Sequence, residues 1–212
     1  MNFQDKVVVV TGATGGIGSK AVDAFLREGA SVVASDLDVD KLDELKRASI
    51  NPNKLITMAG DVSESATHIA LIDLATKSFG GVDIAVNNAG ISHEVGRLPL
   101  IEDECARRVI EVDLVAVFFA MKAQLPIMAK QYEDTKRVGS IINVSSIYGV
   151  VSPDQSIYEY RRKNGNSFYK PIAYSVSKSG LINMTKYLAV YWAKFEVRVN
   201  CLVLAGVDNN QD

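Results

Sequence analysis

Short runs of β-branched and apolar residues alternate along the chain with longer stretches in which apolar positions recur at helical spacing. Runs such as Val-Val-Val-Val at 7–10 lack polar/apolar alternation, which is typical of strands buried on both faces of a parallel sheet. We expect six strands, at residues 7–11, 31–35, 54–59, 83–87, 140–144 and 197–203. The helical pattern covers residues 15–28, 39–49, 63–79, 101–131 and 172–194.

The repeated strand–helix–strand order predicts an α/β fold, a doubly wound Rossmann-type parallel sheet with helices on both faces in three layers. A chain of 212 residues is expected to form a single domain with one sizeable core. The stretch 148–171 is polar, aromatic and too long for an ordinary connection, which is typical of segments with a function of their own.

Charge and rare residues narrow the classes of function. Lys plus Arg is 23 and Asp plus Glu is 25, so neither nucleic acid nor an anionic membrane surface is expected as a main partner. Two cysteines, Cys105 and Cys201, and two histidines, His68 and His93, are too few for a disulfide framework or a metal cluster, so we expect no metal. The sequence shows no basic leader and no 18-residue apolar run, which predicts a cytoplasmic enzyme or binding domain.

A glycine-rich segment, Thr-Gly-Ala-Thr-Gly-Gly-Ile-Gly at residues 11–18, follows the first predicted strand and opens the first predicted helix. Glycines allow a tight turn and a close approach of the backbone to a pyrophosphate, and the helix N-terminus offers unpaired N–H groups. A plain glycine turn is the alternative, but this position in a βαβ unit favours a dinucleotide site. The residues expected to hold the dinucleotide here are Gly12, Thr14, Gly15, Gly16, Ile17 and Gly18.

Asp36 ends the second strand, 18 residues after the last of these glycines. A carboxylate there accepts hydrogen bonds from the adenosine ribose hydroxyls and repels a 2′-phosphate. Neither Gly15 nor Leu37 supplies a compensating cation, so NAD is favoured over NADP; the alternative is that Asp36 caps the next helix. Asp61 and Val62 are expected at the adenine edge, with capping of the following helix as an equal alternative.

At this point the chain resembles the single-domain branch of the short-chain dehydrogenase/reductase family. The glycine-rich segment fits that family's T-G-x-x-x-G-x-G, and also the pattern of the extended, epimerase-like branch. The run Asn87-Asn88-Ala89-Gly90 after the fourth strand looks like the N-N-A-G of the single-domain branch. The resemblance implies a nicotinamide dinucleotide cofactor, with Asn88, Ala89 and Gly90 in contact with it.

The catalytic signature of that family, Tyr-x-x-x-Lys, is matched by Tyr174 and Lys178. The spacing alone is weak evidence, because a second copy begins at Tyr132. Tyr174 opens a predicted helix and follows a serine pair at the end of the fifth strand, whereas Tyr132 has no upstream serine and is expected at a solvated helix end. The resemblance implies that Ser146 binds the substrate oxygen and that Tyr174 and Lys178 also hold the nicotinamide ribose.

The chemistry explains the trio. A free phenol titrates near ~10, too high for a base at neutral pH. An ammonium at about 4 Å, at an effective dielectric of about 20, attracts the phenolate by roughly 4 kcal/mol, so we expect Lys178 to lower the pKa of Tyr174. Tyr174 then exchanges a proton with a secondary alcohol or ketone while hydride passes to or from the nicotinamide. Ser145 is expected to be a structural strand-end residue.

Three departures from the family pattern stand out. Asp113 occupies the place of an asparagine that usually completes the catalytic group, and its charge is expected to raise the pKa of Tyr174 relative to an asparagine form. Ala205-Gly206 replaces Pro-Gly in the loop that frames the nicotinamide, where Gly206 and Val207 are expected to contact the cofactor. Family members continue beyond this point, so we expect domain 1–212 to be C-terminally truncated and its sheet to lack the final strand.

The stretch 148–171 carries aromatic residues and cations, among them Arg161 and Arg162, beside the expected substrate mouth. Such a composition suits an anionic sugar or sugar-phosphate-like substrate, and the text around Phe168–Lys178 resembles members linked to flagellin modification and nonulosonate-sugar synthesis. A solvated surface hairpin is the alternative.

Two other functions stay open at this stage. One is a catalytically weak dinucleotide-binding protein or subunit; the other, sugar-nucleotide epimerase chemistry, is disfavoured by residues 87–90 and the length. The family resemblance implies a homodimer or homotetramer packed through residues 101–131 and 172–194. Packing on the sheet is the alternative for the apolar side chains considered for that contact, Leu181, Met184, Leu188 and Trp192.

Overall fold

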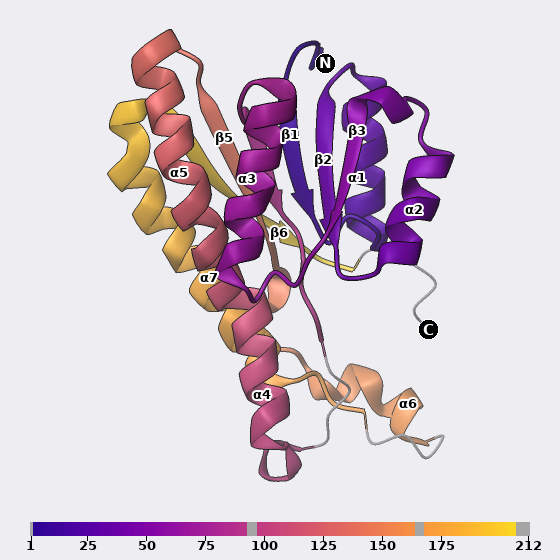
Figure 1. Cartoon of the computed structure of the whole chain (residues 1–212). Helices are drawn as coiled ribbons and strands as arrows, with labels where there is room; N and C mark the ends of the chain where they lie inside the picture. Colours follow the sequence, from indigo (N-terminus) through magenta and orange to yellow (C-terminus); the bar gives the residue numbers. More distant parts are fainter. Residues whose placement is uncertain (1, 93–96, 164–167, 207–212) are drawn as a thin grey trace.

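Figure 1 shows the computed structural model of the chain, which describes residues 2–92, 97–163 and 168–206. Its centre is one parallel sheet in the order β3-β2-β1-β4-β5-β6. The predicted strands are confirmed to within two residues at each end. The strands are β1 (Val7–Thr11), β2 (Ser31–Asp36), β3 (Leu55–Ala59), β4 (Ile84–Asn87), β5 (Gly139–Ser146) and β6 (Val197–Leu204).

Helices cover both faces of the sheet, which confirms the three-layer, doubly wound fold (Figure 1). Helices α1 and α2 pack on one face, and α3, α5 and α7 pack on the other. The helices are α1 (Gly16–Arg27), α2 (Val39–Ala48), α3 (Ser65–Phe79), α4 (Asp103–Ile110), α5 (Ala116–Thr135), α6 (Glu159–Lys163) and α7 (Ile172–Trp192).

Strand β1 shows why the central strands have no polar/apolar alternation. Val7 and Val9 face one core, built with α3, α5 and α7, while Val8 and Val10 face the second core against α1. All four are buried because helices lie on both sides. The strand order reverses between β1 and β4, which pair in parallel, so their carboxyl ends lie side by side. Ligands of open α/β sheets bind at the carboxyl ends of the strands where the order reverses.

The predicted helix over residues 101–131 needs one correction. It consists of α4 and α5 joined by a π-helical turn, Glu111–Val115, which inserts one residue into the helical register and carries Asp113. The combined stretch Asp103–Thr135 is long and apolar enough to cross a membrane by length and composition, yet 56% of its most apolar window is buried inside the protein, as in a core helix.

The apolar side chains of α7 considered for a subunit contact pack on the sheet instead. Leu181 is fully buried, and Met184, Leu188 and Trp192 are partly buried against the core that contains it. This face of α7 packs on the sheet because the helix lies directly over β5 and β6. A different face of α7 is exposed, formed by Ile172, Val176, Tyr187, Val190 and Tyr191.

At the edge of the sheet, β6 exposes Leu202 and Val203 and is the sixth strand of the sheet formed by the described residues. Beyond β5 the chain forms 3-10 turns and the short α6, which lie near the start of α4 at the carboxyl edge of the sheet (Figure 1). This segment, described over residues 147–163 and 168–171, is called the insert below.

Candidate active site

The glycine-rich loop and the loop after β4 hold each other at the carboxyl ends of β1 and β4. Gly12 has a φ of +63°, and a Cβ there would lie 2.8 Å from the Cα of Ala89, so only glycine fits. The side-chain amide of Asn88 donates to the carbonyls of Thr11 and Gly12, both at 3.0 Å. A Cβ on Gly18 would overlap the carbonyl oxygen of Gly12, so Gly18 allows α1 to begin close to the strand.

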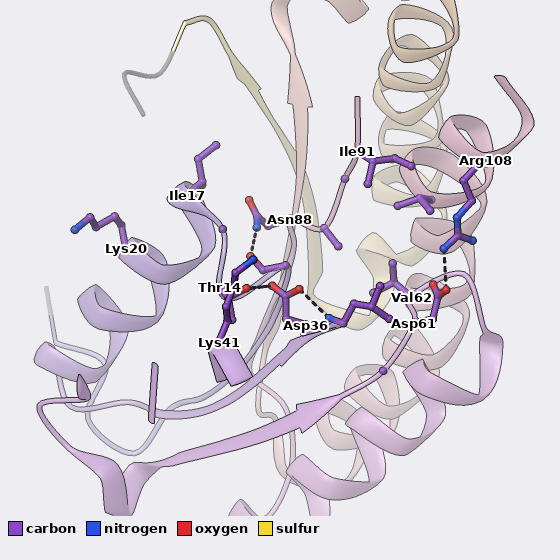
Figure 2. A pocket seen from close by; sticks show the side chains of 18 residues that line it. Thr14, Ile17, Lys20, Asp36, Lys41, Asp61, Val62, Asn88, Ile91 and Arg108 are labelled. Carbon is purple, nitrogen blue, oxygen red and sulfur yellow. Dashed lines mark hydrogen bonds and ion pairs between the residues drawn. The ribbon is translucent and has the colours of Figure 1, made fainter. Parts of the chain in front are cut away.

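A cavity of about 820 Å³ opens beside this loop (Figure 2). Gly18 does not line it, because its place is beneath the loop in the packing against Gly12. The residues predicted to hold the dinucleotide that do line it are Gly12, Thr14, Gly15, Gly16, Ile17, Asp36, Asp61, Val62, Asn88, Ala89 and Gly90. Seven further lining residues, not foreseen from the sequence, are Lys20, Leu37, Lys41, Gly60, Ile91, Arg108 and Val112.

Asp36 faces the cavity at the end of β2 and is held there by its own chain. Oδ2 accepts hydrogen bonds from the backbone N–H and the hydroxyl of Thr14, at 2.9 and 2.6 Å, and Oδ1 accepts from the N–H of Leu37 at 2.8 Å (Figure 2). The alternative that Asp36 caps α2 is wrong, because Asp38 is that cap and accepts from the N–H of Lys41. Thr14 therefore orients the carboxylate that is expected to meet a ribose.

Two lysines on this side of the cavity bear on cofactor choice. Lys20 comes from α1, and Lys41 comes from α2, where its Nζ lies 3.2 Å from a carboxylate oxygen of Asp38. The sequence argument considered only the neighbours of Gly15 and Asp36 in the chain, so it missed cations that α1 and α2 bring to the same cavity. The packing of α1 and α2, and not the local sequence, places Lys20 and Lys41 at the cavity.

Asp61 has a structural role that sequence analysis left open. Its Oδ1 accepts from the N–H and the hydroxyl of Ser63, which secures the turn before α3, and its Oδ2 accepts from Arg108 at 2.8 Å. Burial raises the pKa of Asp61, but the hydrogen bonds from Ser63 and Arg108 outweigh it and leave the pKa below the usual value. The alternative that Asp61 caps α3 is wrong, because the N-cap of α3 is Glu64; Asp61 secures the turn before that helix and lines the cavity.

Ser146, Tyr174 and Lys178 come together at the carboxyl end of β5. Tyr174 hydrogen-bonds with Ser146, and Lys178 lies one turn further along α7 with its Nζ 5.5 Å from the centroid of the Tyr174 ring. The ammonium is buried and donates to the carbonyl of Val144 at 3.3 Å. A Cβ on Gly90 would stand 3.1 Å from this Nζ, so the ammonium adjoins the loop that lines the cavity.

Asp113 joins this group from the π-helical turn. The carboxylate is fully buried; Oδ1 accepts from the N–H of Ile91 at 2.7 Å, and Oδ2 lies 3.3 Å from Nζ of Lys178. Asp113 therefore connects the loop after β4 to the ammonium. The π turn adds one residue to the helical turn, and Asp113 is buried within it. The spacing of apolar residues in the sequence does not reveal this change of helical register.

The pKa of Tyr174 contradicts one expectation and agrees with another. It is raised, first because the phenol is buried and then because of the charge of Asp113, while the hydrogen bond from Ser146 lowers it. The prediction of a lowered pKa is wrong for this structure, because burial of the phenol and the charge of Asp113 together outweigh the hydrogen bond from Ser146. The direction expected from Asp113 agrees with the structure.

The other residues considered in the sequence analysis lie outside the catalytic group. Ser145 donates to the backbone carbonyl of Lys178 at 2.9 Å, so it is structural as expected. The second Tyr-x-x-x-Lys copy lies at the end of α5, where Lys136 covers the ring of Tyr132 at 4.9 Å, as expected for a helix end. Gly206 ends the last described segment with open space around it, and Val207 lies outside the described residues.

The cations of the insert largely hold the insert together. Arg162 donates to the carbonyls of Gln155 and Phe168, so it holds two parts of the insert together. Lys170 lies among the rings of Tyr148, Tyr158 and Phe168, with its Nζ 5.4–5.9 Å from their centroids. A second cavity, of about 420 Å³, separates the insert from α7.

Contact also runs from the insert to the loop after β4. Arg97 donates to the hydroxyl of Tyr169 at 3.2 Å, and this hydrogen bond, together with the positive charge of Arg97, lowers the pKa of that phenol. Within the described residues, no cluster of three or more acidic, histidine or cysteine side chains could hold a metal ion.

Comparison with known proteins identifies the family. Residues 6–160 match the family model described as short chain dehydrogenase. The chain is 33% identical over 204 residues to a 3-oxoacyl-(acyl-carrier-protein) reductase of Thermotoga maritima, covering 95% of this chain and 74% of that protein. It is also 33% identical over 207 residues to cis-4-hydroxycyclohexanecarboxylate dehydrogenase of Sinomonas cyclohexanicum, covering 97% and 75%.

Comparison of the fold with solved structures also finds a short chain dehydrogenase. A crystal structure of a short chain dehydrogenase from Mycobacterium smegmatis superimposes with a TM-score of 0.81 at 28% identity, covering 96% of this chain and 78% of that one. Since the family model spans well over half of its length, this chain belongs to the short-chain dehydrogenase/reductase family of oxidoreductases, which act on CH–OH groups with a nicotinamide dinucleotide.

Proposed function

We propose that this protein is an NAD-dependent oxidoreductase that interconverts a secondary alcohol and a ketone, with Tyr174 as the acid and base. The observation that carries the proposal is the convergence of Ser146, Tyr174 and Lys178, with Nζ of Lys178 next to Gly90, a residue that lines the 820 Å³ cavity.

The cavity fits a dinucleotide on its own geometry. Gly12 and Gly18 allow the loop to pack closely against Ala89 and α1 to begin close beneath the loop, and no side chain caps the N-terminal N–H groups of α1. Asp36 and Thr14 would hold the adenosine ribose, and Lys178 would hold the nicotinamide ribose. When bound, the nicotinamide supplies the hydride acceptor or donor.

The residues of the chain handle the proton. In oxidation, the phenolate of Tyr174 takes the hydroxyl proton of the alcohol as the carbonyl forms and the carbon-bound hydrogen leaves as hydride. Ser146 would orient the same substrate oxygen, because its hydroxyl lies beside the phenol. Lys178 would favour the phenolate to the extent that Asp113 leaves its charge uncompensated.

Replacement of the phenol tests this role. Tyr174→Phe is expected to lower kcat for alcohol oxidation by about a thousandfold, because a general acid–base contributes roughly 10²–10⁴-fold, while the Kd for NAD rises by no more than about tenfold, because only one hydrogen bond to the nicotinamide ribose is lost. Tyr132→Phe serves as the matched control and should change neither. Unchanged turnover in Tyr174→Phe would disprove the proposed mechanism.

The preference for NAD is proposed from Asp36. Its carboxylate is fixed by Thr14 and Leu37, so it cannot swing away from a 2′-phosphate, whereas Lys41 already pairs with Asp38. Asp36→Ala should therefore narrow the ratio of the Kd values for NADP and NAD by at least about tenfold, measured by calorimetry without substrate. Tighter binding of NADP than NAD by the unaltered protein would contradict the proposal.

For the substrate we propose an anionic, sugar or sugar-phosphate-like alcohol. The support is the resemblance noted at residues 168–178, together with the guanidinium of Arg161, which lies 4.1 Å from the centroid of the Phe168 ring in the insert. Turnover of sugar phosphates by Arg161→Ala compared with Arg162→Ala distinguishes a binding cation from a structural one. Equal kinetics of both variants and the unaltered protein would reject this substrate class.

A second candidate, a dinucleotide-binding protein with weak catalysis, is favoured by the raised pKa of Tyr174 and the pairing of Lys178 with Asp113. The two candidates differ in one experiment. Calorimetric binding of NAD together with reduction of NAD by a panel of secondary alcohols supports the enzyme, whereas binding without any reduction supports the second candidate.

We also propose a cytoplasmic homodimer or homotetramer. The exposed stripe of α7 supports an assembly, since Val176, Tyr187, Val190 and Tyr191 lie on the side of the helix away from the sheet. Light scattering coupled to gel filtration tests this: Val190→Lys should shift the protein towards the monomer, and Lys186→Ala, on the same helix, should not.

A further inference from the structure

The second cavity, of about 420 Å³, lies between the insert and a face of α7 that does not carry the catalytic group. Neither Tyr174 nor Lys178 lines it. The residues of α7 that line it recur at helical spacing and are Ile172, Ser175, Val176 and Ser179. This cavity is therefore separate from the catalytic group and from the cavity beside the glycine-rich loop.

Apolar side chains form a large part of the wall of this second cavity. Val150 and Val151 come from the insert, and Ile172 and Val176 come from α7. These four side chains are 47–65% exposed, so a ligand with an apolar body would remove their surface from water. Cavities of this volume hold small molecules, and a few polar groups then fix the orientation of the ligand.

Lys170 supplies the charge. Of the described residues that line this cavity it alone is charged, and its ammonium lies against the rings of Tyr148, Tyr158 and Phe168. Burial lowers the pKa of Lys170 and the charge of Arg161 lowers it further, and no carboxylate in the described part of the chain opposes them. An ammonium in such surroundings favours an anion as its ligand.

Ser175 and the start of α7 add hydrogen-bond donors to the same cavity. The Oγ of Ser175 is buried and has no hydrogen-bond partner among the described residues, although Ser175 lines the cavity. Helix α7 begins at Ile172, another lining residue, and no side chain caps its first turn. The unpaired N–H groups and the dipole of a helix N-terminus favour negative charge, as the ammonium does.

We propose that this cavity binds a small carboxylic acid with an apolar body, whose carboxylate pairs with Lys170 and accepts a hydrogen bond from Ser175. The apolar body would lie against Val150, Val151 and Val176. A single ammonium balances a carboxylate, whereas a phosphate dianion would bring a second charge against an apolar wall. The acid is a second ligand and not the alcohol, so the inference does not depend on the proposed function.

The first test is calorimetry, without dinucleotide and without alcohol, using phenylbutyrate, octanoate and their neutral amides. At least one acid should bind at least about tenfold more tightly than its amide, since charge-assisted hydrogen bonds are about twice as strong as neutral ones. Inorganic phosphate should bind at least about tenfold more weakly than that acid. No detectable binding of either acid, or phosphate binding as tight as the acid, overturns the inference.

The second test locates the acid. Saturating NAD should change the Kd of the acid by less than about threefold, because the two cavities share no lining residue among those described. Displacement of the acid by NAD would place it in the large cavity and would overturn the inference. Failure of NAD to bind would count against the proposed function alone.

Two variants then remove the polar groups one at a time. Lys170→Met should weaken the acid at least about tenfold and its amide less than about threefold, and retained binding of the amide shows that the cavity still forms. Ser175→Ala should weaken the acid about three- to tenfold. Without the acid it should leave the midpoint of urea unfolding unchanged, because no hydrogen bond within the described residues is lost. Unchanged affinity for the acid in both variants overturns the inference.

Two controls complete the design. Lys163→Met removes the same charge from an exposed position of the insert that does not line the cavity, so the Kd should stay within about twofold. An equal loss in Lys163→Met and Lys170→Met would mean that net charge alone acts, which overturns the inference. Val190→Lys should also keep the affinity, because position 190 lies about three turns beyond the last lining residue of α7.

Discussion

The pairing of Asp113 with Lys178 should control how readily Tyr174 acts as a base. In Asp113→Asn the amide keeps the size of the side chain and can still accept from the N–H of Ile91. It removes the negative charge that competes with a phenolate for the ammonium. The pKa of Tyr174 should therefore fall, and the pH dependence of alcohol oxidation should move towards acid.

The magnitude follows from the distances. Nζ of Lys178 lies 3.3 Å from Asp113 and 5.5 Å from the centroid of the Tyr174 ring, which puts the carboxylate and the ring within about 9 Å of each other. At about 8 Å and an effective dielectric of about 20, two unit charges interact by about 2 kcal/mol. Tyr174 is partly exposed, so we expect about 1–2 kcal/mol, or about five- to thirtyfold in kcat/KM for oxidation below the pKa.

The assay is the pH profile of kcat/KM for oxidation, with an ultraviolet titration of the phenol as a readout independent of turnover. Comparing Asp113→Asn with Asp113→Asn/Tyr174→Phe isolates the titration of Tyr174 from the other tyrosines. Glu111→Gln removes an exposed carboxylate from the same π turn and should leave the profile in place. An alkaline shift in Asp113→Asn, or no shift, would refute the reasoning.

Three further predictions concern binding and stability. Gly12→Ala should weaken NAD at least about tenfold in calorimetry, since a Cβ strains a positive φ and enters the loop after β4; equal affinity would contradict the role of this loop. Arg137→Met should cost about 2–4 kcal/mol in urea unfolding at pH 7, because the buried Asp83 loses its hydrogen-bonded cation and keeps only the more distant Lys6, at 3.6 Å. This loss should diminish as pH falls through the folded pKa of Asp83, which hydrogen bonds from Arg137 hold below the usual value despite burial, and a pH-independent loss would contradict it. Gln124→Leu should cost about 1–3 kcal/mol in the same assay, because it leaves the buried amide of Asn87 short of partners, and a neutral effect would contradict that.

The strands and the glycine-rich loop could be predicted because their causes are local. A strand covered on both faces needs continuous apolar residues, and a backbone that turns at a φ of +63° beside Ala89 needs glycine at Gly12. The family motifs then suggested Ser146, Tyr174 and Lys178, which the structure brings together. Sequence order alone could not reveal that the helix predicted over 101–131 contains a π turn.

What the sequence by itself determined is the succession of strands and helices and the position of the glycine-rich loop, because each depends on residues close together in the chain. Only the tertiary structure decided how the charges pair. Lys178 meets Asp113 across 65 positions, and Arg108 meets Asp61 across 47, because the carboxyl ends of parallel strands and the helices that follow them gather at one edge of the sheet. Such long-range pairs change the pKa of Tyr174 and the wall of the cavity, and no local pattern in the sequence encodes them.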